Sequence, residues 1–309
     1  MARQIPDEAT ELAGDRHADL GHLHLATEVE PAETLGEAQL RVQSLCRYPV
    51  KSMLGETVDS MFVDEHGAEG DRRLALLDAQ TGHVASAKQA RLWRGLLKCT
   101  ANGNTGRVRI ALPDGTNVTA DDPGVDELLS RLLERPVRLI SKRPDGATVE
   151  RPDPEKLLEL GLDAAADEVG GRILEIAQAT PGDSFTDDAP LHAITTATLE
   201  HIGVEALRYR PNLVIATPAG YPPYAENDWI GEEFVIGEAR LRVLAATTRC
   251  VVPTLEHGPL PRAPQALRIP AAENRWNASG SGAQPCAGAY FGVLVAGVIR
   301  VGDRVTVEL

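Results

Sequence analysis

The stretch RVRIALPDGTNVT, residues 107–119, shows most directly how this chain folds. Its apolar residues Val108, Ile110 and Leu112 alternate with other residues, which is the period of a strand with one buried face. The Asp114-Gly115 pair that follows is typical of a tight turn between antiparallel strands. Residues 107–112 and 116–119 are therefore predicted to form a β-hairpin.

The same pattern of short apolar runs separated by turn residues recurs along the chain. Short strands joined by tight turns favour a mainly β, β-barrel-like protein with a few helices over a doubly wound parallel sheet. Further hairpins are predicted to join Leu74–Asp78 to His83–Ser86, Phe234–Ile236 to Leu241–Val243 across Gly237-Glu238, and Val298–Val301 to Val305–Leu309 across Gly302-Asp303, with other strands at Pro136–Ile140, Leu213–Ala216 and Phe291–Val295.

Three helices are predicted from capping residues and apolar spacing. The first has Asp122 at its N-cap, Pro123 in its first turn, and apolar residues up to Leu133 on one face, so it is expected to pack on a sheet. Thr196 is predicted to cap a second helix that runs through His201. A third, short helix is predicted from Asp153-Pro154 through Leu160.

Changes in composition suggest how the chain is divided. Residues 1–38 carry scattered charges with little apolar periodicity and are predicted to be a disordered tail. A first β-barrel domain is predicted over 39–142 and a second over 143–309, with the boundary in the polar, proline-containing segment 141–153. The Ser- and Gly-rich segment 277–282 is predicted to be a flexible insertion.

Charge and cysteine content limit the classes of function. The 309 residues carry a formal net charge of −14, which disfavours nonspecific binding of nucleic acid or of an anionic membrane, so an anionic ligand must meet local positive charge. With no apolar run of membrane-spanning length and no signal-peptide pattern, the chain is predicted to be cytoplasmic. The four cysteines are scattered without a C-x-x-C, so a functional thiol is expected to act singly.

Two basic segments of the first half are candidate anion-binding elements. Lys51 and Ser52 place a cation and a hydroxyl together after a proline-restricted segment, and Arg72 follows a Gly-rich turn. Lys and Ser donate hydrogen bonds to phosphate, and arginine can bind it bidentately. The ordinary alternatives are a solvated Lys-Ser turn and a loop ion pair between Asp71 and an arginine.

Two segments of the second half carry further candidates. Arg210 can bind an oxyanion and Asn212 offers both a donor and an acceptor, or the pair is an ordinary surface turn. Cys250 ends an apolar strand beside Arg249, and a neighbouring cation favours the thiolate that attacks electrophiles or binds a soft metal. The alternative is an inert buried cysteine. G-x-S-x-G, P-loop and H-E-x-x-H motifs are absent, and nothing in the sequence brings His192 or His201 to Cys250.

Taken in order, these segments resemble the MOSC family, the molybdenum-cofactor sulfurase C-terminal domain proteins, preceded by their N-terminal β-barrel domain. Within it the chain is similar to the mitochondrial amidoxime reducing component and to bacterial YcbX- and YiiM-like proteins. The segments that carry the resemblance are Tyr48–Ser52, Gly67–Arg72, Leu74–Asp78, Phe185–Asp187, Leu191–Leu199, Tyr209–Val214, Trp229–Gly231, Ile236-Gly237, Arg249-Cys250, Tyr290–Gly292 and Gly297–Val305.

The resemblance implies a pyranopterin molybdenum cofactor and reduction of small N-hydroxylated substrates. By this resemblance Cys250 is the metal ligand, and Asp187 lies near the metal, where it positions water or supplies protons. Asp188 departs from the hydroxyl residue of some relatives, and the segment 277–282 would alter the substrate entrance. The positions implied to contact the pterin and phosphate are Lys51, Ser52, Arg72 and Arg210, with Asn212, Thr248 and Arg249 beside them.

The electron donor and two other functions stay open at this point. No four-cysteine ferredoxin segment follows Leu309, so electrons are expected from a separate flavin or iron–sulfur protein. The first alternative is a sulfur carrier that uses a persulfide on Cys250, and the second is a non-catalytic carrier of molybdenum cofactor. The family resemblance also brings pyridoxal phosphate binding as an associated property.

Overall fold

The computed structural model describes residues 39–104, 107–153, 156, 158–159, 171–277 and 282–308. The predicted tail at 1–38, nearly all of the predicted helix at 153–160 and the middle of the 277–282 insertion lie outside these residues. The part of the chain from Ala38 onward forms one compact unit. No helix in the described segments is both long and apolar enough to span a membrane.

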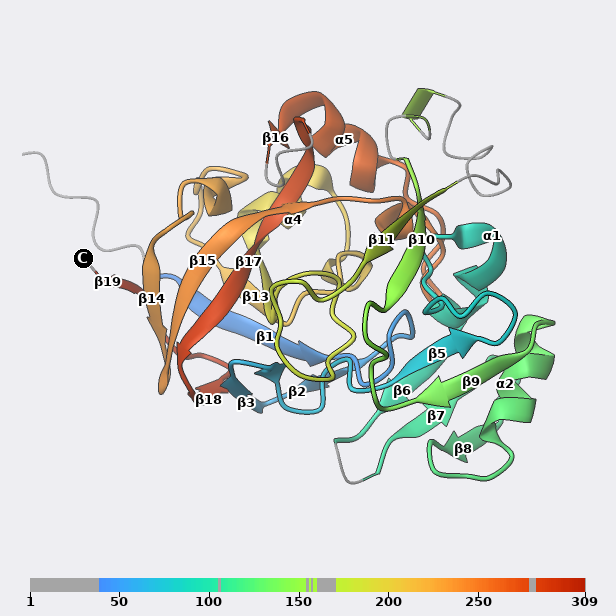
Figure 1. Ribbon diagram of the computed structural model, residues 1–309. Helices are drawn as coiled ribbons and strands as arrows, with labels where there is room; N and C mark the ends of the chain where they lie inside the picture. Colours follow the sequence, from blue (N-terminus) through green and yellow to red (C-terminus); the bar gives the residue numbers. More distant parts are fainter. Residues whose placement is uncertain are drawn as a thin grey trace, which may run out of the picture. The chain divides into compact units, whose positions relative to one another are not determined.

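A nine-stranded sheet forms the largest element of the described fold (Figure 1). Its strand order is β19-β14-β15-β17-β12-β13-β1-β2, with β16 paired to β17 off this path. Most neighbours are antiparallel, whereas β12 and β13 are parallel. The strands are β1 (Arg41–Arg47), β2 (Glu56–Val58), β12 (Leu191–Thr195), β13 (Leu213–Ala216), β14 (Glu233–Ile236), β15 (Ala239–Thr248), β16 (Arg275–Trp276), β17 (Gln284–Val295) and β19 (Val305–Glu308).

The two ends of this sheet approach each other without closing a full barrel. The second half of β1 pairs with β2, whereas its first half meets the residues just before β19. The contact is one bridge between Arg41 and Arg304, supported by backbone hydrogen bonds such as Val42 N to the Asp303 carbonyl at 2.9 Å. The predicted mainly β class is therefore confirmed. The sheet curves like a barrel, but no continuous hydrogen-bonded ladder joins its two ends.

Smaller sheets surround the large one, and the predicted hairpin at 107–119 is among them. It forms β7 and β8, joined at Ile110 and Val118. The small sheets are β18-β3-β4, β5-β9, β6-β7-β8 and β10-β11, formed by β3 (Ser60–Asp64), β4 (Gly67–Ala68), β5 (Ala75–Asp78), β6 (Thr100–Asn102), β7 (Arg109–Ala111), β8 (Asn117–Thr119), β9 (Val137–Ile140), β10 (Thr148–Pro152), β11 (Gly171–Glu175) and β18 (Gly297–Arg300).

The predicted helix after Asp122 is present but begins later than expected. It runs over Val125–Leu133 as α2, and Gly124 is its N-cap, because the Asp122 carboxylate accepts a hydrogen bond from Gly124 N at 2.7 Å and forms a turn before the helix. The helix predicted at Thr196 is α4 (Thr196–Ile202), capped by Thr195. The other helices with defined bounds in the described segments are α1 (Ala90–Trp93), α5 (Gln265–Glu273), η1 (Arg94–Lys98), η3 (Ala206–Arg208), η4 (Ala225–Asn227) and η5 (Val252–Thr254).

One predicted hairpin is wrong in its pairing. The turn at Gly302 exists, with φ of 90°, but β18 pairs with β3 and β19 pairs with β14, so the two strands enter different sheets. The predicted hairpin between β5 and the 83–86 segment is present but short: Leu77 bridges Val84, and Asp78 N and Ala85 N donate to the His83 and Leu76 carbonyls at 2.9 and 2.8 Å, whereas the longer ladder of β5 is with β9. A local turn signal cannot distinguish a hairpin from a corner between sheets.

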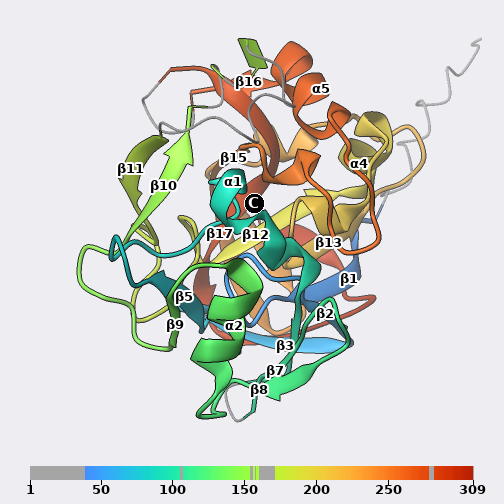
Figure 2. The same cartoon turned by 90° about the vertical axis from the view of Figure 1, so that its right-hand side faces the viewer.

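The connections between elements determine where the site lies. Because β12 and β13 are adjacent, the loop before β12 lies near the loop before β13, and both precede strands buried in the main core. The β10–β11 hairpin forms a sheet of its own at one side of the molecule (Figure 2). The segment predicted as an interdomain linker, 141–153, thus contains β10.

Candidate functional site

One cavity of about 420 Å³ brings together nine candidate site residues that the sequence indicated. Eight Lys and Arg side chains and four carboxylates line it, so the cavity has the local positive charge that an acidic chain needs to bind an anion. The sequence-predicted residues that line it are Lys51, Ser52, Arg72, Asp187, Arg210, Asn212, Thr248, Arg249 and Cys250.

Cys250 supplies the thiol of this cavity, two residues after β15 ends. All four cysteines are free, and Cys99 and Cys286 are buried, whereas Cys250 is partly exposed. Cys46 is also partly exposed, but it lies on β1 and does not line the cavity. The accessible thiol of the cavity is therefore the one that the sequence indicated.

Three of the predicted anion-binding residues have strained backbone conformations. Ser52, Arg72 and Arg210 have φ values of 68°, 45° and 54°, in the left-handed region that side chains other than Gly and Asn rarely adopt. Such conformations cost on the order of 1–3 kcal/mol each and cluster at ligand sites. Surrounding hydrogen bonds hold these backbone conformations. For example, Ser52 Oγ accepts a hydrogen bond from Ala87 N at 3.0 Å.

Two arginines of this group stack on one tyrosine ring. The guanidinium carbons of Arg72 and Arg210 lie 4.7 and 4.4 Å from the centroid of Tyr48. Arg72 also donates to Asp71 at 2.5 Å and to the Arg210 carbonyl at 3.0 Å. Arg210 donates to the Met53 carbonyl at 2.6 Å, whereas its Nη2 is buried without a partner. Burial and the charge of Arg72 lower the pKa of Arg210 to about 10.

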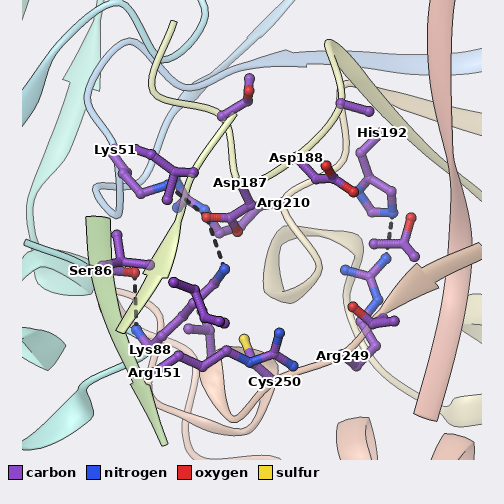
Figure 3. Close-up of a pocket in the computed structure, with 18 of the residues that line it drawn as sticks. Lys51, Ser86, Lys88, Arg151, Asp187, Asp188, His192, Arg210, Arg249 and Cys250 are labelled. Carbon is purple, nitrogen blue, oxygen red and sulfur yellow. Dashed lines mark hydrogen bonds and ion pairs between the residues drawn. The ribbon is translucent and has the colours of Figure 1, made fainter. Parts of the chain in front are cut away.

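Asp187 lies between two lysines (Figure 3). Its Oδ1 accepts from Lys51 Nζ at 2.6 Å and lies 3.0 Å from Lys88 Nζ, and Lys51 also donates to the Phe185 carbonyl at 2.8 Å. Burial alone would raise the pKa of Asp187, but the two ammonium groups hold it well below the usual value. Burial lowers the pKa of Lys51 to about 8 despite this partner.

The Arg249 side chain contacts neighbouring residues of the second half of the chain rather than the Cys250 thiol. Its Nε donates to the Ala287 carbonyl at 2.8 Å, its Nη2 lies 2.5 Å from His192 Nε2, and its guanidinium stacks on Tyr209 at 4.7 Å. Burial and the charge of Arg249 lower the pKa of His192 well below the usual value, so His192 is a neutral acceptor. Arg249 thus fixes the backbone just before Cys250.

Neither histidine acts as a base for a catalytic cysteine in this arrangement. His192 is committed to Arg249, and His201 lies on α4, where it pairs with Glu273 at 2.5 Å. Asn212 is likewise structural in its contacts, since its Oδ1 accepts from His192 N at 3.2 Å and its Nδ2 donates to the Cys46 carbonyl at 3.3 Å. It ties β1 to the loop that carries Arg210.

Sequence reasoning missed four cations that line the cavity: Lys88, Arg151, Arg172 and Arg208. Lys88 belongs to no motif, and only the fold brings it to Asp187. Arg151 lies on β10, where alternation with the buried Val149 is a weak signal that it faces inward. The departure noted at Asp188 does fall in the cavity, where burial and Asp187 raise the pKa of its carboxyl.

The donor set does not suit a bare metal ion. Among the described residues, no group of three or more His, Cys, Asp or Glu side chains can hold one. The site thus defines a class: a mainly β protein with a cation-lined cavity and one accessible sulfur.

Comparison with known proteins agrees with this class. Residues 39–132 match the model of the MOSC N-terminal beta barrel domain and residues 182–306 match that of the MOSC domain. The chain belongs to the MOSC domain family, as the ordered motifs predicted.

Curated relatives are similar over part of their length. Mitochondrial amidoxime-reducing component 1 is 30% identical in Mus musculus and 28% in Homo sapiens, over 136 residues each. These matches cover 40% of this chain, but only 37% and 38% of the relatives. Among solved structures, the YUAD protein from Bacillus subtilis matches 86% of this chain and 94% of its own, at 10% identity and a TM-score of 0.39. YiiM from Geobacillus stearothermophilus matches 52% and 72%, at 19% identity and a TM-score of 0.29.

Proposed function

We propose that this protein is a molybdenum-cofactor-dependent oxidoreductase that reduces N-hydroxylated compounds. The observation that carries the proposal is that one accessible thiol shares a single cavity with cations from both matched domains. The similarity to amidoxime-reducing proteins supplies the reaction class.

The chemistry of the cavity fits a pyranopterin cofactor with a phosphate group. Cys250 offers the soft sulfur ligand that such a metal prefers. Arg210 Nη2 and Thr247 Oγ1 are buried polar atoms without a protein partner, as expected where a ligand completes their hydrogen bonds. We assign phosphate and pterin binding to Lys51, Ser52, Arg72 and Arg210, with Asn212, Thr248 and Arg249 holding the surrounding backbone.

The reaction consumes two electrons and two protons: R–NH–OH + 2 e⁻ + 2 H⁺ → R–NH₂ + H₂O. When bound, the cofactor supplies the two-electron redox chemistry for this N–O cleavage, and a separate flavin or iron–sulfur protein supplies the electrons. Asp187 is a hydrogen-bond acceptor because its neighbours keep it ionised, so we assign it the orientation of water. Water that Asp187 orients supplies the protons.

The test is purification from a host that makes the cofactor, followed by metal analysis and an assay of N–O reduction. We expect about one molybdenum per chain and turnover with a chemical or enzymatic reductant. Cys250→Ala should lose activity without a change in thermal midpoint, because the thiol is partly exposed. Cys46→Ala, a second partly exposed thiol outside the cavity, is the matched control and should stay active.

Three results would replace this proposal. Folded protein without molybdenum would exclude the cofactor. A persulfide on Cys250 after incubation with a cysteine desulfurase, without bound pterin, would indicate a sulfur carrier. Bound pterin without turnover of any N-hydroxylated compound would indicate a cofactor carrier.

A further inference from the structure

The β10–β11 hairpin presents a mixed apolar and cationic face to the cavity. Its ladder pairs Arg151 with Arg172 and Val149 with Leu174. Residues two apart in a strand share one face, so these four side chains lie together, and all four line the cavity. One wall of the cavity thus consists of two arginines beside two aliphatic side chains.

Two arginines at directly opposed positions repel each other, so this pairing needs compensation. Arg172 receives part of it from Asp153, with Nη2 to Oδ2 at 3.2 Å, and its side chain is 70% exposed. Arg151 has no such compensation at Nε and Nη2, because both atoms are buried and have no hydrogen-bond partner. Buried guanidinium donors without an acceptor are costly, and an anion between the two arginines would satisfy them.

The position of Arg151 indicates substrate rather than cofactor. The cations assigned to the cofactor come from the loops after β1, after β4 and before β13, whereas Arg151 lies on strand β10. In the view of Figure 3, Arg151 is drawn at the end of the cavity that holds Cys250, away from Lys51. A substrate must reach the sulfur-bound centre, so a group beside it is placed to hold the substrate.

We infer that Arg151, assisted by Arg172, binds a carboxylate of the substrate, and that the enzyme prefers N-hydroxylated compounds with an apolar body and a carboxylate. Guanidinium and carboxylate form paired, charge-assisted hydrogen bonds, and Val149 and Leu174 contact the apolar body. This inference rests on the proposed function for the reacting group, but the anion site itself does not depend on turnover.

The test compares benzamidoxime with 4-carboxybenzamidoxime on the cofactor-loaded protein. Wild type should have the higher kcat/KM for the carboxylate. Arg151→Gln should lower kcat/KM for that substrate about 10- to 100-fold, mainly through KM, and leave benzamidoxime within about twofold. Arg172→Gln should act in the same direction and less strongly. Arg109→Gln, an exposed arginine on β7, is the matched control and should change neither substrate.

Calorimetric titration with the same two compounds and metal analysis separate the possible failures. If no N–O reduction occurs but 4-carboxybenzamidoxime still binds in an Arg151-dependent way, the proposed reaction fails and the anion site stands. If Arg151→Gln loses molybdenum, the arginine binds cofactor and the inference is overturned. Equal effects on both compounds, or no preference in wild type, would also overturn it.

Discussion

At the scale of single residues, the site is built on like charges held close together. Arg72 and Arg210 share one tyrosine ring, and Lys51 and Lys88 share one aspartate. Such arrangements are unfavourable in an empty site and become favourable when an anion binds, which is the physical signature of a ligand cavity. Asp187 is the exception, since its charge is already compensated by two lysines and it is a poor proton donor.

The lowered pKa of Lys51 predicts a pH dependence. Its ammonium form predominates below pH 8, and is lost as pH rises through the pKa of about 8. Because this ammonium is assigned to the anionic cofactor, the affinity for the cofactor should weaken as pH rises above 8, by up to about tenfold per pH unit. In Lys51→Arg, whose side chain stays charged, cofactor retention should not change between pH 6 and 10. Molybdenum content after gel filtration at each pH measures this, and wild-type retention that is constant to pH 10 would refute it.

The sequence predicted the site residues that carry motifs and missed those that depend on topology. Cys250 follows the apolar strand β15 and Arg210 precedes the apolar strand β13, so the local pattern placed both at strand ends. Lys88 and Arg151 reach the cavity only because distant segments fold around it, and no local pattern encodes that. The role of Arg249 also differs from the local expectation, because its donors face Ala287 and His192.

At the scale of elements, short helices and strands depend on partners outside themselves. Helix α4 has only seven residues, too few to be stable alone. The carboxylate of Glu226, fully buried on η4, accepts from Thr195 N at 2.7 Å and from Thr198 Oγ1 at 2.8 Å. A second element thus caps the first turn of α4 with a negative group, which the helix dipole favours.

We predict that Glu226→Gln lowers the free energy of unfolding by about 1–3 kcal/mol, because a buried acceptor is replaced by an amide that leaves one donor unpaired. Glu200→Gln is the control, since it removes the same charge from an exposed position of α4 and should change stability by less than about 0.5 kcal/mol. Urea denaturation followed by circular dichroism measures both. Equal effects of the two substitutions would show that charge rather than capping matters.

Strand positions were predictable at this scale, but strand partners were not. The strand predicted at Leu213–Ala216 is β13 with the same bounds, because four consecutive apolar residues strongly favour a buried strand. The Gly302 turn was also correct, yet β18 and β19 leave it for different sheets. Partners are selected by burial against the rest of the molecule, which a turn of two residues does not encode.

At the scale of the whole molecule, the first and second halves of the sequence share strands and core. β1 pairs with β13, and β3 pairs with β18. Gly67 on β4 approaches the segment before β12 so closely that a Cβ there would lie 2.6 Å from the Pro190 carbonyl oxygen. One hydrophobic cluster joins Ala87, Ala90 and Leu97 to Val251, Val252, Leu255 and Leu267, and this cluster lies next to Cys250.

This interleaving predicts that the two halves unfold together. The chain provides its own probes, since Trp93 lies in a core cluster of the first half, Trp229 lies in the main sheet core, and Trp276 is 39% exposed. Two proteins that retain only Trp93 or only Trp229, with the other tryptophans replaced by Phe, report each core separately. In each, tryptophan fluorescence and far-ultraviolet circular dichroism should give the same urea midpoint and slope, as for a two-state transition. If the Trp93 signal changes at a lower urea concentration than the dichroism, the first half unfolds independently. The cavity, which is lined from both halves, would then lose Lys51 and Arg72 while Cys250 stays in place.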